Sequence, residues 1–116
     1  MSPSTKEERK DLSALCDSVK HLTHEGDLTK CEELIADAMG RYPHAPQPHN
    51  LMGVLYEIRN DHVGALKHFR AAWSLDPTYV PARHNLDNFA SFYIKSKYAF
   101  DESDCPMEIE KHGRKF

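Results

Sequence analysis

Histidine and cysteine side chains can bind a metal ion, and the 116 residues of this chain include eight histidines and three cysteines. His21 and His24 are three positions apart on an expected helix, so they can share one face. His44 and His49 flank a proline-rich turn. A structural zinc site usually has about four closely spaced ligands, often including paired cysteines, and no such pair occurs here. We therefore predict scattered surface histidines and no metal site.

The cysteines are also the candidate nucleophiles. Cys16 and Cys31 fall at expected helical positions, and Cys31 is predicted to be a core thiol rather than a reactive one. Cys105 lies in the stretch DESDCPMEIE, where we expect it to be exposed and its acidic neighbours to raise its pKa. No glycine-rich phosphate loop, GxSxG or HExxH motif occurs. The sequence therefore predicts no enzyme, no catalytic residue and no cofactor.

The bulk properties exclude several classes of partner. A net charge of −3 argues against nucleic acid, because binding to phosphates needs a basic face. No apolar run approaches the roughly 18 residues that a membrane span requires, and the first residues, MSPSTKEERKDLS, do not form a signal peptide. An odd number of cysteines favours a reducing compartment. We therefore predict a cytoplasmic protein that binds neither nucleic acid nor membrane.

The elements that would position these side chains repeat along the sequence. When the chain is shifted by 34 residues, small, bulky and turn-forming residues fall on residues of the same kind. The matched pairs are Gly26 and Asn60, Cys31 and Ala65, Ile35 and Phe69, Ala38 and Ala72, and Pro43 and Pro77. The repetition predicts two similar structural units.

The second unit, residues 46–79, is the more complete and reads as two helices. Gly53 on the first helix and Ala65 and Ala72 on the second are small enough for the two helices to pack closely, and Phe69 fills the space beside them. The pattern also indicates that Tyr56, Phe69 and Trp73 belong to the core.

The ends of these helices have recognisable signals. Asn60 tolerates the left-handed conformation that ends a helix, and Asp61 is a good N-cap for the next one. Asp27 or Thr29 is expected to cap the corresponding helix of the first unit. Pro77 cannot continue a helix, so the second unit must end there.

This pattern resembles the tetratricopeptide repeat family. The signature residues appear as Met52-Gly53-x2-Tyr56, Ala65-x3-Phe69, Ala72 and Pro77, with His49 where the family usually has tryptophan. The resemblance implies an all-α fold, an α-α superhelix (right-handed solenoid) of about five antiparallel helices. The expected parts are an N-terminal helix extension (1–11), repeat 1 (12–45), repeat 2 (46–79), a C-terminal capping helix (80–97) and a disordered tail (98–116).

The resemblance also implies a function, because the family's concave groove usually binds a peptide or a segment of another protein. Asn50 and Asn88 carry amides that can hydrogen-bond an extended backbone, and Val54 and Ile58 offer an apolar floor. The basic clamp for chaperone C-termini is absent. The predicted partner-binding residues are Lys20, His24, Asn50, Val54, Glu57, Ile58, His84, Asn88 and Phe92.

Two functions from different classes stay open. The first is a non-catalytic scaffold or adaptor that binds a peptide or protein segment in its groove. The second is a subunit that associates with itself through exposed apolar residues of the C-terminal helix. Those residues are Phe89, Phe92, Tyr93 and Ile94. A strict monomer at micromolar concentration would exclude the second function.

Overall fold

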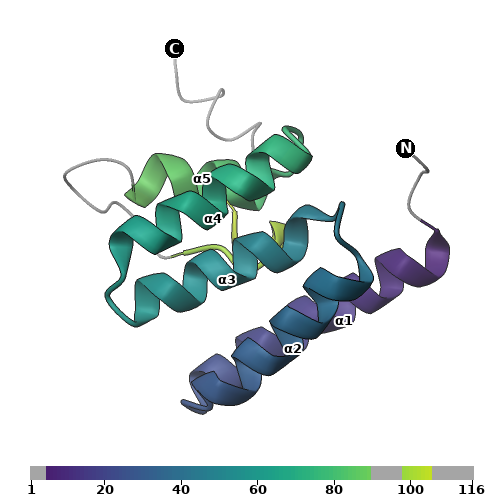
Figure 1. Cartoon of the computed structure of the whole chain (residues 1–116), viewed down its shortest axis with the longest axis horizontal. Coiled ribbons are helices and arrows are strands. Elements are labelled where there is room, and N and C mark those ends of the chain that lie inside the picture. Colours follow the sequence, from purple (N-terminus) through teal and green to yellow (C-terminus); the bar gives the residue numbers. More distant parts are fainter. Residues whose placement is uncertain (1–4, 90–97, 106–116) are drawn as a thin grey trace.

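The computed structural model describes residues 5–89 and 98–105, and these residues form helices and loops without any strand. Figure 1 shows the helices in order along the chain. They are α1 (Lys6–His24), α2 (Leu28–Arg41), α3 (Pro46–Ile58), α4 (His62–Leu75), α5 (Val80–Phe89) and the short 3-10 helix η1 (Glu102–Asp104). The prediction of an all-helical protein is confirmed for this part of the chain.

The 34-residue repetition appears in the turns between the helices. Asp27 caps α2 by accepting a hydrogen bond from the Lys30 amide at 3.2 Å, and Asp61 caps α4 in the same way from the Gly64 amide at 2.9 Å. Immediately before these caps, Gly26 and Asn60 have φ values of 82° and 66°. Glycine and asparagine tolerate that left-handed conformation better than other residues do.

Gly53 brings α3 and α4 into close contact, as predicted. A Cβ atom at this position would lie 2.4 Å from Cε1 of Phe69, whose ring is fully buried. Ala65 and Ala72 are also fully buried on α4. The missing side chain at Gly53 therefore provides the space that the phenylalanine ring occupies.

Helix α3 is the central element of the molecule. It contacts α1, α2, α4 and α5, and α1 and α5 lie on either side of it (Figure 1). This position explains why Leu51, Val54 and Leu55 are all at most 1% exposed. Three helices, α1, α3 and α5, thus present a shared face on which further residues can pack.

Two expectations about individual segments need correction. Trp73 is 44% exposed, because α5 packs against the side of α4 that carries Ala72, and Trp73 points about 100° away from that residue. Residues 98–105 are not a disordered tail: Ala99 and Phe100 are buried, and η1 follows them. The predicted capping helix is α5 as far as Phe89, and residues 90–97 and 106–116 lie outside the described part of the chain.

Candidate functional site

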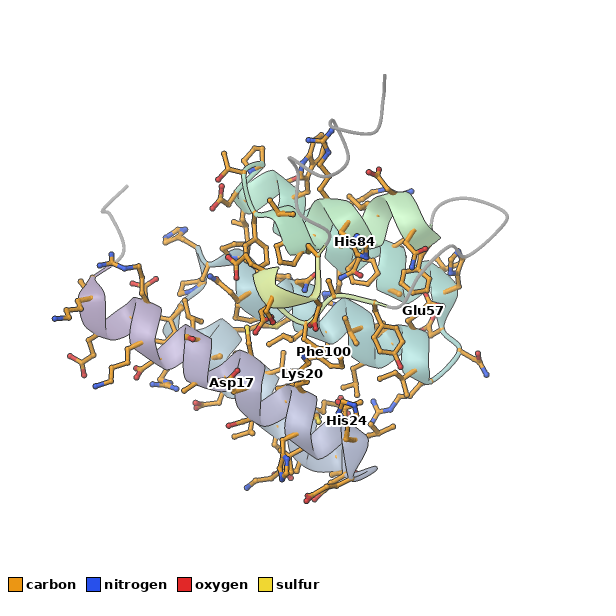
Figure 2. The ribbon with its side chains drawn as sticks, turned by 180° about the vertical axis from the view of Figure 1, so that it is seen from behind. Asp17, Lys20, His24, Glu57, His84 and Phe100 are labelled. Atoms are coloured by element: carbon orange, nitrogen blue, oxygen red, sulfur yellow. The ribbon has the colours of Figure 1, made fainter. Side chains whose placement is uncertain are left out.

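Residues 98–105, which we call the C-terminal segment, lie across the face shared by α1, α3 and α5 (Figure 2). Ala99 is fully buried and Phe100 is 5% exposed, whereas Glu102 and Ser103 are exposed. We call the residues that contact this segment the segment site; its main members are Lys20, Asn50, Asn85 and Phe89.

Two buried asparagines hold the backbone of Ala99. Asn85 accepts a hydrogen bond from the Ala99 amide at 2.8 Å, and it donates to the Ala99 carbonyl at 2.9 Å. Asn50 donates to the same carbonyl at 3.0 Å. The two asparagines also bond to each other, from Nδ2 of Asn85 to Oδ1 of Asn50 at 2.8 Å. Both side chains are fully buried, so the backbone of one residue satisfies most of their hydrogen-bonding capacity.

Aromatic rings join the segment to the hydrophobic core. Phe69 stacks on Phe89 with ring centroids 6.2 Å apart, and Phe89 stacks on Tyr98 at 6.1 Å. Tyr98 then meets Phe100 edge to face at 5.6 Å. Pairs of this geometry add to the stabilisation from burial alone. The segment is therefore anchored by ring packing on both sides of Ala99.

An ion pair fixes the far end of the segment. Nζ of Lys20 lies 2.6 Å from Oδ1 of Asp104, and the Lys20 ammonium also lies 6.0 Å from the centre of the Phe100 ring. Figure 2 shows the labelled Phe100 and Lys20 together on this face. The hydrogen bond to Asp104 raises the pKa of Lys20. Both groups are therefore charged at neutral pH.

The turn of η1 brings Asp104 back toward Lys20. Asp101 accepts a hydrogen bond from the Ser103 amide at 3.0 Å, and Oδ2 of Asp104 accepts from the Phe100 amide at 2.9 Å. Burial alone would raise the pKa of Asp104, but the hydrogen bonds from Lys20 and from the Phe100 amide outweigh it and lower that pKa. The carboxylate thus serves both the turn and the ion pair.

The structure brings some of the sequence-predicted site residues to the segment. Lys20 and Asn50 bond to it directly, and Asn88 is buried on α5. Val54 belongs to the core, where it is 1% exposed, and Ile58 packs against that core from its edge. Val54 and Ile58 thus pack in or against the hydrophobic core, and this packing accounts for both residues without their predicted role as the apolar floor of a groove.

The other predicted residues have different surroundings. His24 is exposed and its Nδ1 lies 2.8 Å from the Lys20 carbonyl oxygen. Glu57 lies 3.1 Å from Nδ1 of His62 rather than on the segment. His84 is half-buried on α5, and Phe92 lies outside the described residues.

Asn85 is the residue that sequence reasoning missed. Of the two asparagines on α5, the sequence prediction placed Asn88 in the site and left out Asn85, although Asn85 lies three residues earlier and helical neighbours at this spacing share a face. The three-residue spacing of Asn85 and Asn88 was therefore the sequence signal that could have identified Asn85. The acceptor itself, the backbone of Ala99, gave no signal because it lies in a stretch without periodicity.

The thiols of α1 and α2 are buried. Cys31 is fully buried, which confirms the prediction of a core thiol. Burial, with a smaller contribution from Asp101, raises the pKa of Cys16 to about 12, so this thiol is neutral at physiological pH. Among residues 5–89 and 98–105, no group of three or more His, Cys, Asp or Glu side chains has a metal-binding arrangement. No helix in these ranges is long and apolar enough to span a membrane.

Comparison with known proteins provides no relative for this chain. No protein-family model, curated protein or solved structure matches it.

Proposed function

We propose that this protein is a non-catalytic interaction module of the tetratricopeptide-repeat type, which binds an extended segment of another protein. In this proposal residues 12–45 and 46–79 are two repeats, α5 is the capping helix, and the helices stack as a right-handed superhelix. The contact of α3 with both α1 and α5 supports this stacking, because the first helices of successive repeats line one face in such proteins. Free cysteines suit a cytoplasmic location.

The pairing of two buried asparagines with the backbone of Ala99 is the observation that carries the proposal. Asn50 and Asn85 form hydrogen bonds to the main chain of Ala99 in the C-terminal segment. Contacts of this kind can be made with the backbone of any extended segment, while neighbouring pockets select side chains. The geometry is therefore suited to peptide recognition, and the neutral, buried Cys16 is unsuited to nucleophilic catalysis.

Peptide selection followed by NMR tests the proposal. Peptides from a random display library would be selected on the full chain and titrated into protein labelled with ¹⁵N. We expect selected peptides to shift the side-chain amide signals of Asn50 and Asn85, whereas the exposed Asn60 serves as the internal control. Peptides that bind without moving these two signals, or a library that yields no binder, would contradict the proposal.

A self-associating subunit is the second candidate. Of the residues expected to form its apolar patch, Phe89 is buried, and Phe92, Tyr93 and Ile94 lie outside the described residues. Exposed Trp73 and Val80, at 44% and 47%, instead favour an apolar contact near the junction of α4 and α5. Sedimentation at micromolar concentrations decides this question, since a strict monomer removes the candidate.

A further inference from the structure

We infer, on the basis of the proposed function, that the C-terminal segment occupies the binding site as an internal stand-in for the partner. The partner segment would then share its pattern: a small residue, a phenylalanine directly after it, and an acidic residue four positions after the phenylalanine. In this chain these positions are Ala99, Phe100 and Asp104. The partner binds by displacing the chain's own segment.

The requirement for a small residue follows from the surroundings of Ala99. This residue is fully buried, and both its amide and its carbonyl are bonded to asparagine side chains. A larger side chain would push the backbone away from Asn50 and Asn85, because protein interiors leave little unfilled space. Only a small side chain allows these hydrogen bonds to form.

The phenylalanine and the acidic residue account for the remaining contacts. The Phe100 ring is 5% exposed beside Lys20, so this position selects a large apolar side chain. Lys20 then pairs with Asp104, which η1 turns back toward it. Asp17 lies on the same helix as Lys20 and adds negative charge beside it. This charge disfavours further acidic residues in a bound peptide, so we expect the site to select an acidic residue at this one position rather than acidic peptides in general.

The segment's contacts are of a kind that another chain can replace. Its polar bonds to the helices include those of the Ala99 backbone to Asn85 and that of the Asp104 carboxylate to Lys20. A second peptide with the same pattern offers these groups again. A segment attached to its own site competes at an effective concentration that is in the millimolar range for short linkers. The intact chain should therefore bind such a peptide much more weakly than a chain whose segment is weakened.

Fluorescence anisotropy with a defined peptide tests this inference. The probe is a labelled octapeptide with the sequence of residues 98–105 carrying Cys105→Ser. The weakened protein carries Phe100→Ala and Asp104→Asn, and the matched control carries Glu102→Gln, which removes an exposed charge from the same segment. We expect the weakened protein to bind the probe at least about tenfold more tightly than the wild type or the control. The same probe with alanine in place of phenylalanine should lose most of this affinity.

A milder variant covers the case in which the double variant does not fold. Asp104→Asn alone removes one partly exposed ion pair, and we expect about threefold tighter binding of the probe than in the wild type. Equal binding to all of these proteins, or no binding to a folded weakened protein, overturns the inference.

Two further outcomes separate this inference from the proposed function. If library peptides shift the Asn50 and Asn85 amide signals while the octapeptide does not bind, the proposed function stands and the inference fails. If neither the library nor the octapeptide gives a binder, both fail. Exchange of the segment between two copies, seen as a dimer that the octapeptide dissociates, also overturns the inference, because the occupant is then a second copy of this chain.

Discussion

Two asparagines illustrate how much of this molecule depends on single side chains. Asn85 makes hydrogen bonds to both backbone groups of Ala99 and to Asn50, whereas Asn50 bonds to the Ala99 carbonyl and to Asn85. All of these atoms are buried, and a buried polar group that loses its partner is costly. The two side chains are therefore not equivalent.

The asparagine pair leads to a prediction about stability. We expect Asn85→Ala to lower the free energy of unfolding by about 1–3 kcal/mol, because it leaves the Ala99 amide and Oδ1 of Asn50 without partners. Asn50→Ala should cost less, since Asn85 still donates to the Ala99 carbonyl. Urea denaturation of both variants measures the difference. A larger loss for Asn50→Ala would contradict the observed network.

The packing of α3 on α4 depends on the absence of a side chain at Gly53, which leaves room for the Phe69 ring. Gly53→Ala places a methyl group 2.4 Å from the Phe69 ring, and we expect a loss of about 1–3 kcal/mol in the free energy of unfolding. Gly40→Ala is the matched control, because nothing lies within 4 Å of its Cβ position on α2. That change should stabilise the protein by about 0.5–1 kcal/mol. Thermal melts compare them, and a harmless Gly53→Ala would mean that Phe69 can move aside.

The same pair of helices carries two facing histidines. Nδ1 of His49 on α3 and Nδ1 of His68 on α4 lie 3.4 Å apart. Burial lowers the pKa of both histidines from the ordinary value, and the charge of His49 lowers the pKa of His68 further. The unfolded chain therefore binds more protons as pH falls from about 6.5, so the free energy of unfolding falls as well. We expect a smaller loss between pH 7.5 and 5 in a His49→Gln, His68→Gln variant, measured by urea titration at each pH. An equal loss would assign the pH dependence to other groups.

At the scale of the whole molecule, the C-terminal segment decides which surfaces are accessible. Cys16 on α1 is 3% exposed, and Asp101 of the segment contributes to its raised pKa. Release of the segment should therefore make the Cys16 thiol more reactive, because a lower pKa and greater access both favour the thiolate. Cys31 lies in the core and serves as the internal control.

Thiol labelling measures this release. In a Cys105→Ser background we expect Phe100→Ala with Asp104→Asn to raise the labelling rate of Cys16 by about tenfold or more, with little change at Cys31. Mass spectrometry of labelled peptides distinguishes the two sites. Parallel increases at both cysteines would indicate general loosening rather than release of the segment.

The helices and their close contact could be predicted because their signals are local or repeat. Asn60, Asp61 and Gly53 act through backbone conformation, capping and the neighbouring helix, and each can be read from a few positions. The segment site could be predicted only in part. Lys20 and Asn50 stand out as polar residues on an expected inner face. The role of Asn85 becomes clear only when its hydrogen-bond acceptor, the Ala99 carbonyl, has been placed beside it.

The amino-acid sequence by itself determined the all-helical fold, the places where helices begin and end, and the approach of α3 to α4. Only the tertiary structure decided where residues 98–105 lie and that Trp73 faces solvent. Asn50 and Ala99 are 49 residues apart, and an extended segment has no periodic pattern of its own. Its position depends on a face that exists only after α1, α3 and α5 have packed together.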